Sequence, residues 1–188
     1  MIQPLRFLIL ATVAVAALFA AGCGNKEDVV LEGKTEGIYL DVGELKYQVQ
    51  ISRQLNPLDT EDQEYLTAVS PTERDLEPDE TWFGVFMRVQ NTTDEPLPVA
   101  SRFEIEDTQG TVFRPILLGP DNGYAYRASA PLEPKEVLPA PNSTAGFGST
   151  RGALLLFKLK VDTLALRPLV LTITPPDGGE RGHVDLDV

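Results

Sequence analysis

The chain has 188 residues and a formal net charge of −12, because 28 acidic side chains face only 16 basic ones. Proteins bind a polyanion through Lys and Arg that release its counterions, so this acidic excess argues against nucleic acid as a partner. Cys23 is the only cysteine, which excludes an internal disulfide and a thiolate metal site, so packing must stabilise the fold.

The first 22 residues have the composition of a secretory signal peptide. Arg6 supplies a short basic head, and Phe7 to Ala21 is apolar apart from Thr12. This run is shorter than the roughly 20 residues that a membrane-spanning helix needs. It ends in small residues directly before the cysteine, in the sequence Leu18-Phe19-Ala20-Ala21-Gly22-Cys23.

This ending resembles the lipobox of bacterial lipoproteins, except that Ala20 stands where that family usually has leucine. The resemblance implies cleavage between Gly22 and Cys23 and a covalent diacylglycerol on Cys23, with no other cofactor expected. It also implies an extracytoplasmic protein anchored to a bacterial cell membrane by lipid. Because anionic headgroups repel an acidic body, the acyl chains would provide the anchoring. The alternative is an ordinary secretory signal in which the cysteine is incidental.

Residues 23–36 are predicted to be the lipidated N-terminus and a flexible tether, because most of them are charged or glycine. Val29 to Leu31 is the only apolar stretch in this segment, so a short edge strand is the alternative. Residues 37–188 are predicted to form a single domain, since this length suffices for one hydrophobic core.

Apolar and polar residues alternate in several short segments of that domain, which is the pattern of half-buried β-strands. The clearest segments are 45–51, 82–90, 103–105, 111–115, 153–161, 169–173 and 183–188, with a further strand region beginning at Ala145 and Phe147. In segment 82–90, one face carries Phe83, Val85, Met87 and Val89. In segment 153–161, Lys158 and Lys160 mark the solvent face and place Leu155, Phe157, Leu159 and Val161 inside. In segment 45–51, the inward residues would be Leu45, Tyr47, Val49 and Ile51.

An acidic connection over residues 56–81 has Arg74 as its only basic residue. Thr60 followed by Gln63 matches a capping box and predicts a short helix around residues 61–68, with Tyr65, Leu66 and Val69 turned towards the sheet. Asp75, Glu77 and Asp79 are a weak calcium candidate, because hard cations prefer oxygen ligands. The alternative for these three is a solvated acidic loop, and no other metal site is expected.

Short strands without βαβ alternation predict an all-β fold, an antiparallel immunoglobulin-like β-sandwich with one short helix in the acidic connection. The run Phe86-Met-Arg-Val89-Gln-Asn91, then the hairpin from Phe103 to Gly110 and a later Leu155-Leu-Phe157, resembles the uncharacterised immunoglobulin-like domain of many bacterial surface lipoproteins. The resemblance covers about residues 37–174 and brings no catalytic residues.

Residues 117–143 are rich in proline and form a long loop that contains Tyr124, Tyr126 and Arg127. Tyrosine and arginine are enriched at interface hot spots, so these three are the predicted partner-binding residues. The alternative is that the tyrosines fold back over the sheet edge.

We therefore expect a non-enzymatic, lipid-anchored module that binds a protein or an envelope component. Alternatives are a carrier of cations or small ligands using the loop 56–81, or, as an outsider, an envelope hydrolase with two carboxylates. His183 is the only histidine, and no G-x-S-x-G motif is present, so no catalytic residue is predicted.

Overall fold

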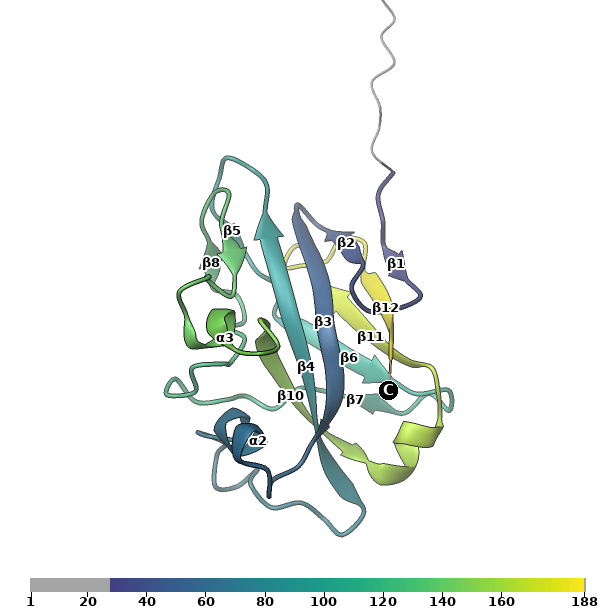
Figure 1. Cartoon of the computed structure of the whole chain (residues 1–188). Helices are drawn as coiled ribbons and strands as arrows, with labels where there is room; N and C mark the ends of the chain where they lie inside the picture. Colours follow the sequence, from purple (N-terminus) through teal and green to yellow (C-terminus); the bar gives the residue numbers. More distant parts are fainter. Residues whose placement is uncertain (1–27, 188) are drawn as a thin grey trace, which may run out of the picture.

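The computed structural model describes residues 28–187 (Figure 1). The signal peptide, Cys23 and the first part of the predicted tether lie outside these residues. The strands are β1 (Glu32–Gly33), β2 (Tyr39–Val42), β3 (Leu45–Leu55), β4 (Glu80–Asn91), β5 (Leu97–Pro98), β6 (Arg102–Glu106), β7 (Val112–Phe113), β8 (Pro131–Leu132), β9 (Val137–Leu138), β10 (Ala153–Lys160), β11 (Leu169–Thr174) and β12 (Gly182–Leu186). The helices are α2 (Thr60–Tyr65), α3 (Thr144–Phe147) and the 3₁₀ helix η2 (Val161–Ala165). None of the helices over 28–187 is long and apolar enough to span a membrane.

Two sheets form the body of the protein, and they pack face to face. One has the strand order β1-β12-β11-β6-β7, and the other has the order β10-β4-β3-β2 with β9 also paired to β4. The short strands β5 and β8 pair with each other at one end of the sandwich (Figure 1). Every strand pair in the described residues except β1 with β12 is antiparallel. The predicted all-β antiparallel sandwich is therefore confirmed.

The main core lies between the two sheets and follows the alternation of the sequence. The β4 side chains predicted to share a face are all buried in it, namely Phe83, Val85, Met87 and Val89. They meet apolar side chains of the opposite sheet, which include Phe103, Ile105, Leu171, Ile173 and Val184. Each fully buried side chain of this kind stabilises the fold by roughly 1.5–3 kcal/mol, so this face determines the strand register.

The outer face of β4 and β10 carries a second buried cluster, which alternation alone does not predict. Trp82 and Phe86 of β4 pack there with Leu154 and Leu156 of β10 under Tyr65 of α2. The Tyr65 ring meets the Phe86 ring edge-on, with 5.0 Å between centroids. The face marked by Lys158 is therefore covered along much of its length rather than fully exposed to solvent.

Two local predictions fail where a strand ends or changes register. A bulge in β3 shifts the pairing with β4 between Val49 and Ile51, so Ile51 is 39% exposed and Ser52 is buried instead. An extra residue in one strand reverses the faces beyond it. Val161 belongs to η2 rather than to β10 and is 47% exposed.

The helix in the acidic connection forms as predicted, but its cap lies one residue earlier. The carboxylate of Asp59, not the hydroxyl of Thr60, accepts from Glu61 N at 2.9 Å and Asp62 N at 3.2 Å. Tyr65, the last residue of α2, is buried, as expected.

A second α-helix, α3, replaces the strand expected at Ala145 and Phe147. Ser143 Oγ accepts from Gly146 N at 3.1 Å and caps this turn. Ala145 is buried and Phe147 is 78% exposed. Local capping therefore overrides the short apolar pattern.

The described part of the predicted tether is bound to the domain, which corrects that prediction. β1 pairs with β12, and the flanking residues also pair, since Asp41 N donates to Val30 O at 2.7 Å and His183 N donates to Leu31 O at 2.8 Å. The edge of β12 has free backbone groups that an added strand satisfies. The edge-strand alternative is therefore closer to the structure, although the strand begins at Glu32 rather than Val29.

Candidate functional site

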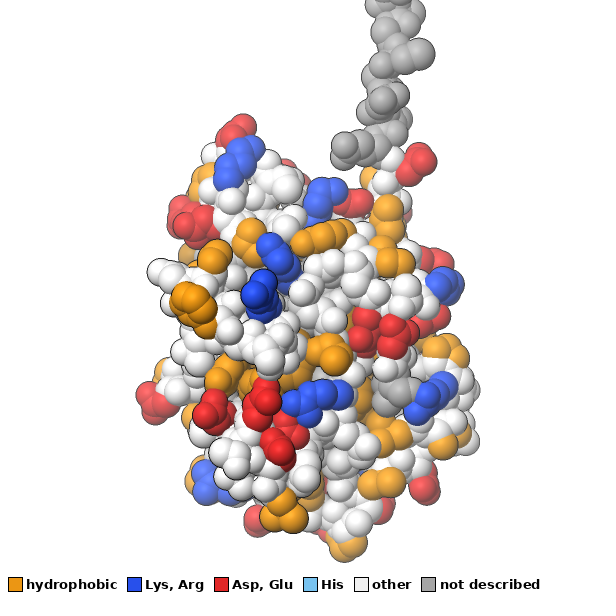
Figure 2. Space-filling model, in the orientation of Figure 1, with side chains coloured by type: hydrophobic (Ala, Val, Ile, Leu, Met, Phe, Trp, Pro, Cys, Tyr) orange, Lys and Arg blue, Asp and Glu red, His pale blue; other side chains and the backbone are white. Residues whose placement is uncertain are grey.

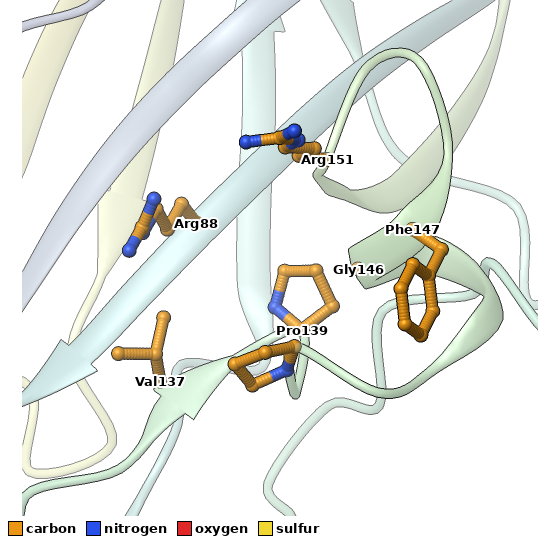
Figure 3. A pocket seen from close by; sticks show the side chains of 7 residues that line it. Arg88, Val137, Pro139, Gly146, Phe147 and Arg151 are labelled. Carbon is orange, nitrogen blue, oxygen red and sulfur yellow. The ribbon is translucent and has the colours of Figure 1, made fainter.

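The most distinctive surface feature lies where β4 changes its partner strand. β10 pairs with β4 as far as Met87, and β9 takes over on the same side at Val89. Arg88 lies between these two pairings, and the connection over residues 139–152 bends away from the sheet there. A pocket of about 290 Å³ forms beneath this connection (Figure 3). Its lining residues are Arg88, Val137, Pro139, Pro141, Gly146, Phe147 and Arg151.

Close backbone packing fixes the wall of the pocket. A Cβ on Gly146 would lie 2.1 Å from the carbonyl oxygen of Ala140, so α3 packs directly on the chain that follows Pro139. A Cβ on Gly152 would lie 2.7 Å from Cβ of Phe86, which holds the end of the connection against β4. Both approaches require glycine, and together they position Arg151 beside the pocket.

Arg88 brings a partly buried charge to this pocket. Its Nε is buried and has no hydrogen-bond partner among residues 28–187, and its guanidinium forms no ion pair there. A guanidinium carries five N–H donors and no acceptor, and buried donors are nearly always paired. The Nη groups of Arg88 form no hydrogen bond with described residues either, so the side chain retains unused capacity to bind an acceptor.

Arg151 brings a second charge at a conformational cost. Its φ is +48°, in the left-handed region that non-glycine residues disfavour by about 1–2 kcal/mol. The side chain of Arg151 forms no hydrogen bond or ion pair with another described residue that would offset this cost. Strained residues of this kind occur preferentially at functional sites.

The two arginines differ from the lysines on this acidic surface, although the exposed Arg102 and Arg181 likewise form no ion pair with described residues. Every lysine within the described range forms an ion pair, namely Lys34, Lys46, Lys135, Lys158 and Lys160. Figure 2 shows two basic groups side by side over β4 near α3, with acidic side chains gathered elsewhere on this face. In Figure 3, Arg88 and Arg151 lie along one side of the pocket, and Val137, Pro139 and Phe147 lie along the other. Arginine pairs of this kind suit carboxylate or phosphate groups, which accept two parallel N–H bonds.

The tyrosines predicted to bind a partner instead pack against the protein. Tyr126 is buried, and its ring meets Phe103 edge-on at 5.0 Å. This burial raises the pKa of Tyr126 well above its ordinary value. Tyr124 packs edge-on against Tyr65 at 4.7 Å and donates to Glu64 Oε2 at 2.7 Å. That hydrogen bond, with burial, raises the pKa of Tyr124 to about 12.

Arg127 is bound by its own loop rather than presented to a partner. Its guanidinium donates to the carbonyl oxygens of Gly119 at 3.1 Å, Pro120 at 2.8 Å and Asn122 at 2.7 Å. The alternative considered for this loop, that its side chains fold back over the sheet, is the arrangement that the structure has.

The acidic connection does not gather its carboxylates into a site. Asp79 pairs with Lys160 at 2.9 Å, which lowers the pKa of Asp79, and the backbone oxygen of Asp75 accepts from Lys158 at 2.8 Å. The structure brings no three His, Cys, Asp or Glu residues within 28–187 together as metal ligands, so Asp75, Glu77 and Asp79 are not gathered into a cluster. His183, the single histidine, lies 3.1 Å from Thr172 Oγ1.

The sequence contains only a weak signal for the Arg88–Arg151 pocket. Arg88 stands on the non-core face of a strong strand, and Arg151 follows a Gly-Ser-Thr run, but neither position indicates that the two line one pocket. Proximity to the proline-rich segment 139–141 is the one local hint.

No protein-family model matches the chain, and no curated protein matches it. Among solved structures, the chain is similar to the yjhA protein from Bacillus subtilis, at 10% identity and a TM-score of 0.47, over 82% of this chain and 99% of that one. It is also similar to an uncharacterized beta-sandwich protein from Clostridium difficile 630, at 12% identity and a TM-score of 0.48, over 82% and 95% of the two chains. A conserved hypothetical protein from Bacillus anthracis follows at 8% identity and 0.45, over 80% and 94%. The chain's own strand pairing makes it an antiparallel β-sandwich, and Arg88 and Arg151 make the pocket on the outer face of one sheet cationic.

Proposed function

We propose that this protein is a lipid-anchored, non-enzymatic binding module of the bacterial cell envelope, with an immunoglobulin-like sandwich that captures an anionic group in the Arg88–Arg151 pocket. The observation that carries the proposal is the pair of guanidinium groups that line one pocket without an acidic partner among the described residues. The signal sequence and the lipobox ending at Cys23 support the location.

The charge distribution favours a single anionic group over an extended polyanion. The whole chain carries a net charge of −12, so its long-range field repels negative partners. Attraction is then confined to the pocket, where the guanidinium groups act within hydrogen-bond distance. Such a site would select a partner that presents one isolated carboxylate or phosphate, on a protein or on another envelope component.

The binding test is calorimetric titration of the full chain, purified in neutral detergent, with acetate and with inorganic phosphate. We expect at least one of these anions to bind, and Arg88→Gln with Arg151→Gln to weaken that binding at least about tenfold. The matched control is Arg102→Gln with Arg181→Gln, which removes the same charge from exposed positions outside the pocket. Absence of binding, or equal weakening by both double variants, would contradict the proposal.

The location has an independent test at Cys23. Cys23→Ser should abolish metabolic labelling with a fatty acid and shift the protein from the detergent phase to the aqueous phase in a phase-separation experiment. Equal partitioning of the variant and the unaltered protein would rule out the lipid anchor, and it would leave the binding test unaffected.

A further inference from the structure

We infer that the ligand of the Arg88–Arg151 pocket is a carboxylate attached directly to an apolar group about as large as one amino acid residue. This inference rests on the proposed function and names the chemistry of its ligand. Two kinds of molecule have that chemistry. One is the C-terminus of a polypeptide whose last residue is apolar, and the other is a small apolar carboxylic acid.

The walls of the pocket argue for an apolar body behind the charge. Apart from the two arginines and Gly146, the lining consists of Val137, Pro139, Pro141 and Phe147. A small hydrated anion gains nothing from contact with apolar side chains. An apolar group that moves from water into contact with them is stabilised in proportion to the apolar area buried. Phe147 is 78% exposed, so its ring is available for such a contact.

The volume argues for a small ligand. A pocket of about 290 Å³ lies at the lower end of the roughly 300–1,000 Å³ range of small-molecule sites, which suits a ligand of about one amino acid with its carboxylate. An internal Asp or Glu of a polypeptide fits less well, because its backbone would bring polar groups on both sides into the apolar part of the pocket.

The charge of the protein argues for a carboxylate over a phosphate. A carboxylate carries one negative charge, whereas a phosphate monoester carries about −1.5 to −2 at neutral pH. On a chain with a net charge of −12, each additional negative charge on the ligand adds repulsion. A planar carboxylate also matches the fork of a guanidinium in a bidentate pair.

The inference is tested by calorimetric titration of the full chain in neutral detergent with four probes. These are N-acetylphenylalanine, its amide, acetate and inorganic phosphate. We expect N-acetylphenylalanine to bind about tenfold tighter than acetate, because of the buried ring, and the amide to show no binding. Phosphate binding as tight as that of N-acetylphenylalanine would overturn the inference and leave the proposed anion site standing. Failure of all four probes would overturn both.

A pair of variants tests whether the apolar wall contributes to the affinity for the ligand. Phe147→Ala should weaken N-acetylphenylalanine severalfold and leave acetate unchanged, whereas Leu117→Ala, at an 85% exposed position outside the pocket, should alter neither. Equal weakening of both probes by Phe147→Ala would contradict the proposed role of the wall.

Two more probes, acetyl-Ala-Ala-Phe and 3-phenylpropionate, distinguish a polypeptide C-terminus from a small free acid as the source of the carboxylate. Tighter binding of the peptide supports a chain end as the source, and equal binding supports a small free acid. Both results support the inference, and binding of neither would overturn it.

Discussion

Arg127 and the pair Arg88–Arg151 show how one residue type serves two purposes in the same protein. The guanidinium of Arg127 donates to three carbonyl oxygens of its own loop at 3.1 Å or less. Arg88 and Arg151 have no such partners within the described chain. The difference teaches that an arginine near a loop indicates binding only if the fold leaves its donors unused.

The tyrosines beside Arg127 extend the same contrast. Tyr126 fills the main core, and Tyr124 covers the second cluster through Tyr65. This segment therefore contributes to stability, whereas the pocket keeps charge and apolar surface available to a ligand. Substitutions in the two regions should separate stability from binding, and the following outcomes are ordered from the largest expected effect to the smallest.

Tyr126→Ala should give the largest change. Removing this buried ring loses its transfer free energy and leaves a cavity beside Phe103, at a cost of about 3–5 kcal/mol. Denaturant unfolding measures this loss, with anion titration under folding conditions as the control. A loss below about 1 kcal/mol would mean that the ring is surface cover rather than core.

Arg127→Ala should destabilise the protein by about 2 kcal/mol, because charge-assisted hydrogen bonds are lost and half-buried carbonyl groups are left without donors. Its control is Arg102→Ala, at an exposed position in β6, which should change the unfolding free energy by less than about 0.5 kcal/mol. Similar denaturant midpoints for Arg127→Ala and Arg102→Ala would contradict the structural role of Arg127.

Arg151→Gly should leave stability within about 1 kcal/mol of the unaltered protein, because relief of the left-handed backbone offsets the greater freedom of glycine in the unfolded chain. The same variant should weaken anion binding at least about tenfold. The two measurements are unfolding by denaturant and titration with N-acetylphenylalanine. A large loss of stability with unchanged binding would place Arg151 in the same class as Arg127.

Tyr124→Phe should have the smallest effect at neutral pH, below about 1 kcal/mol, since it removes one hydrogen bond to Glu64. The effect of this substitution on the free energy of unfolding should depend on pH. The pKa of Tyr124 is raised to about 12 in the folded protein. The unfolded chain has a tyrosine pKa of about 10, so the contribution is fully present below about pH 10 and is lost as the pH rises towards about 12.

Unfolding midpoints measured from about pH 8 upwards check this assignment. The unaltered protein should lose more stability on the alkaline side than Tyr124→Phe does. Parallel losses in the two proteins would show that the Tyr124–Glu64 contact does not contribute to stability.

The sequence alone determined the longest strands and most of the inner face of the sandwich, but not the positions of Ile51, Phe147 and Val161. Alternation in segment 82–90 predicted the burial of Phe83, Val85, Met87 and Val89, because a period of two is a local property of an extended chain that must bury one face. A short helix around residues 61–68 was also predictable from neighbours in the chain, although its cap is Asp59 rather than Thr60 and it ends at Tyr65. The location of the candidate site was not predicted.

Only the tertiary structure decided which polar residues are available. Arg88 and Arg151 line one pocket because β4 exchanges β10 for β9 at that point, and Arg127 is satisfied because its loop closes around it. The bulge at Ile51 and the docking of β1 on β12 likewise depend on pairing between distant segments. Whether a guanidinium is free depends on whether the folded chain places acceptors around it, as the closed loop does for Arg127, and the residue pattern alone does not carry that information.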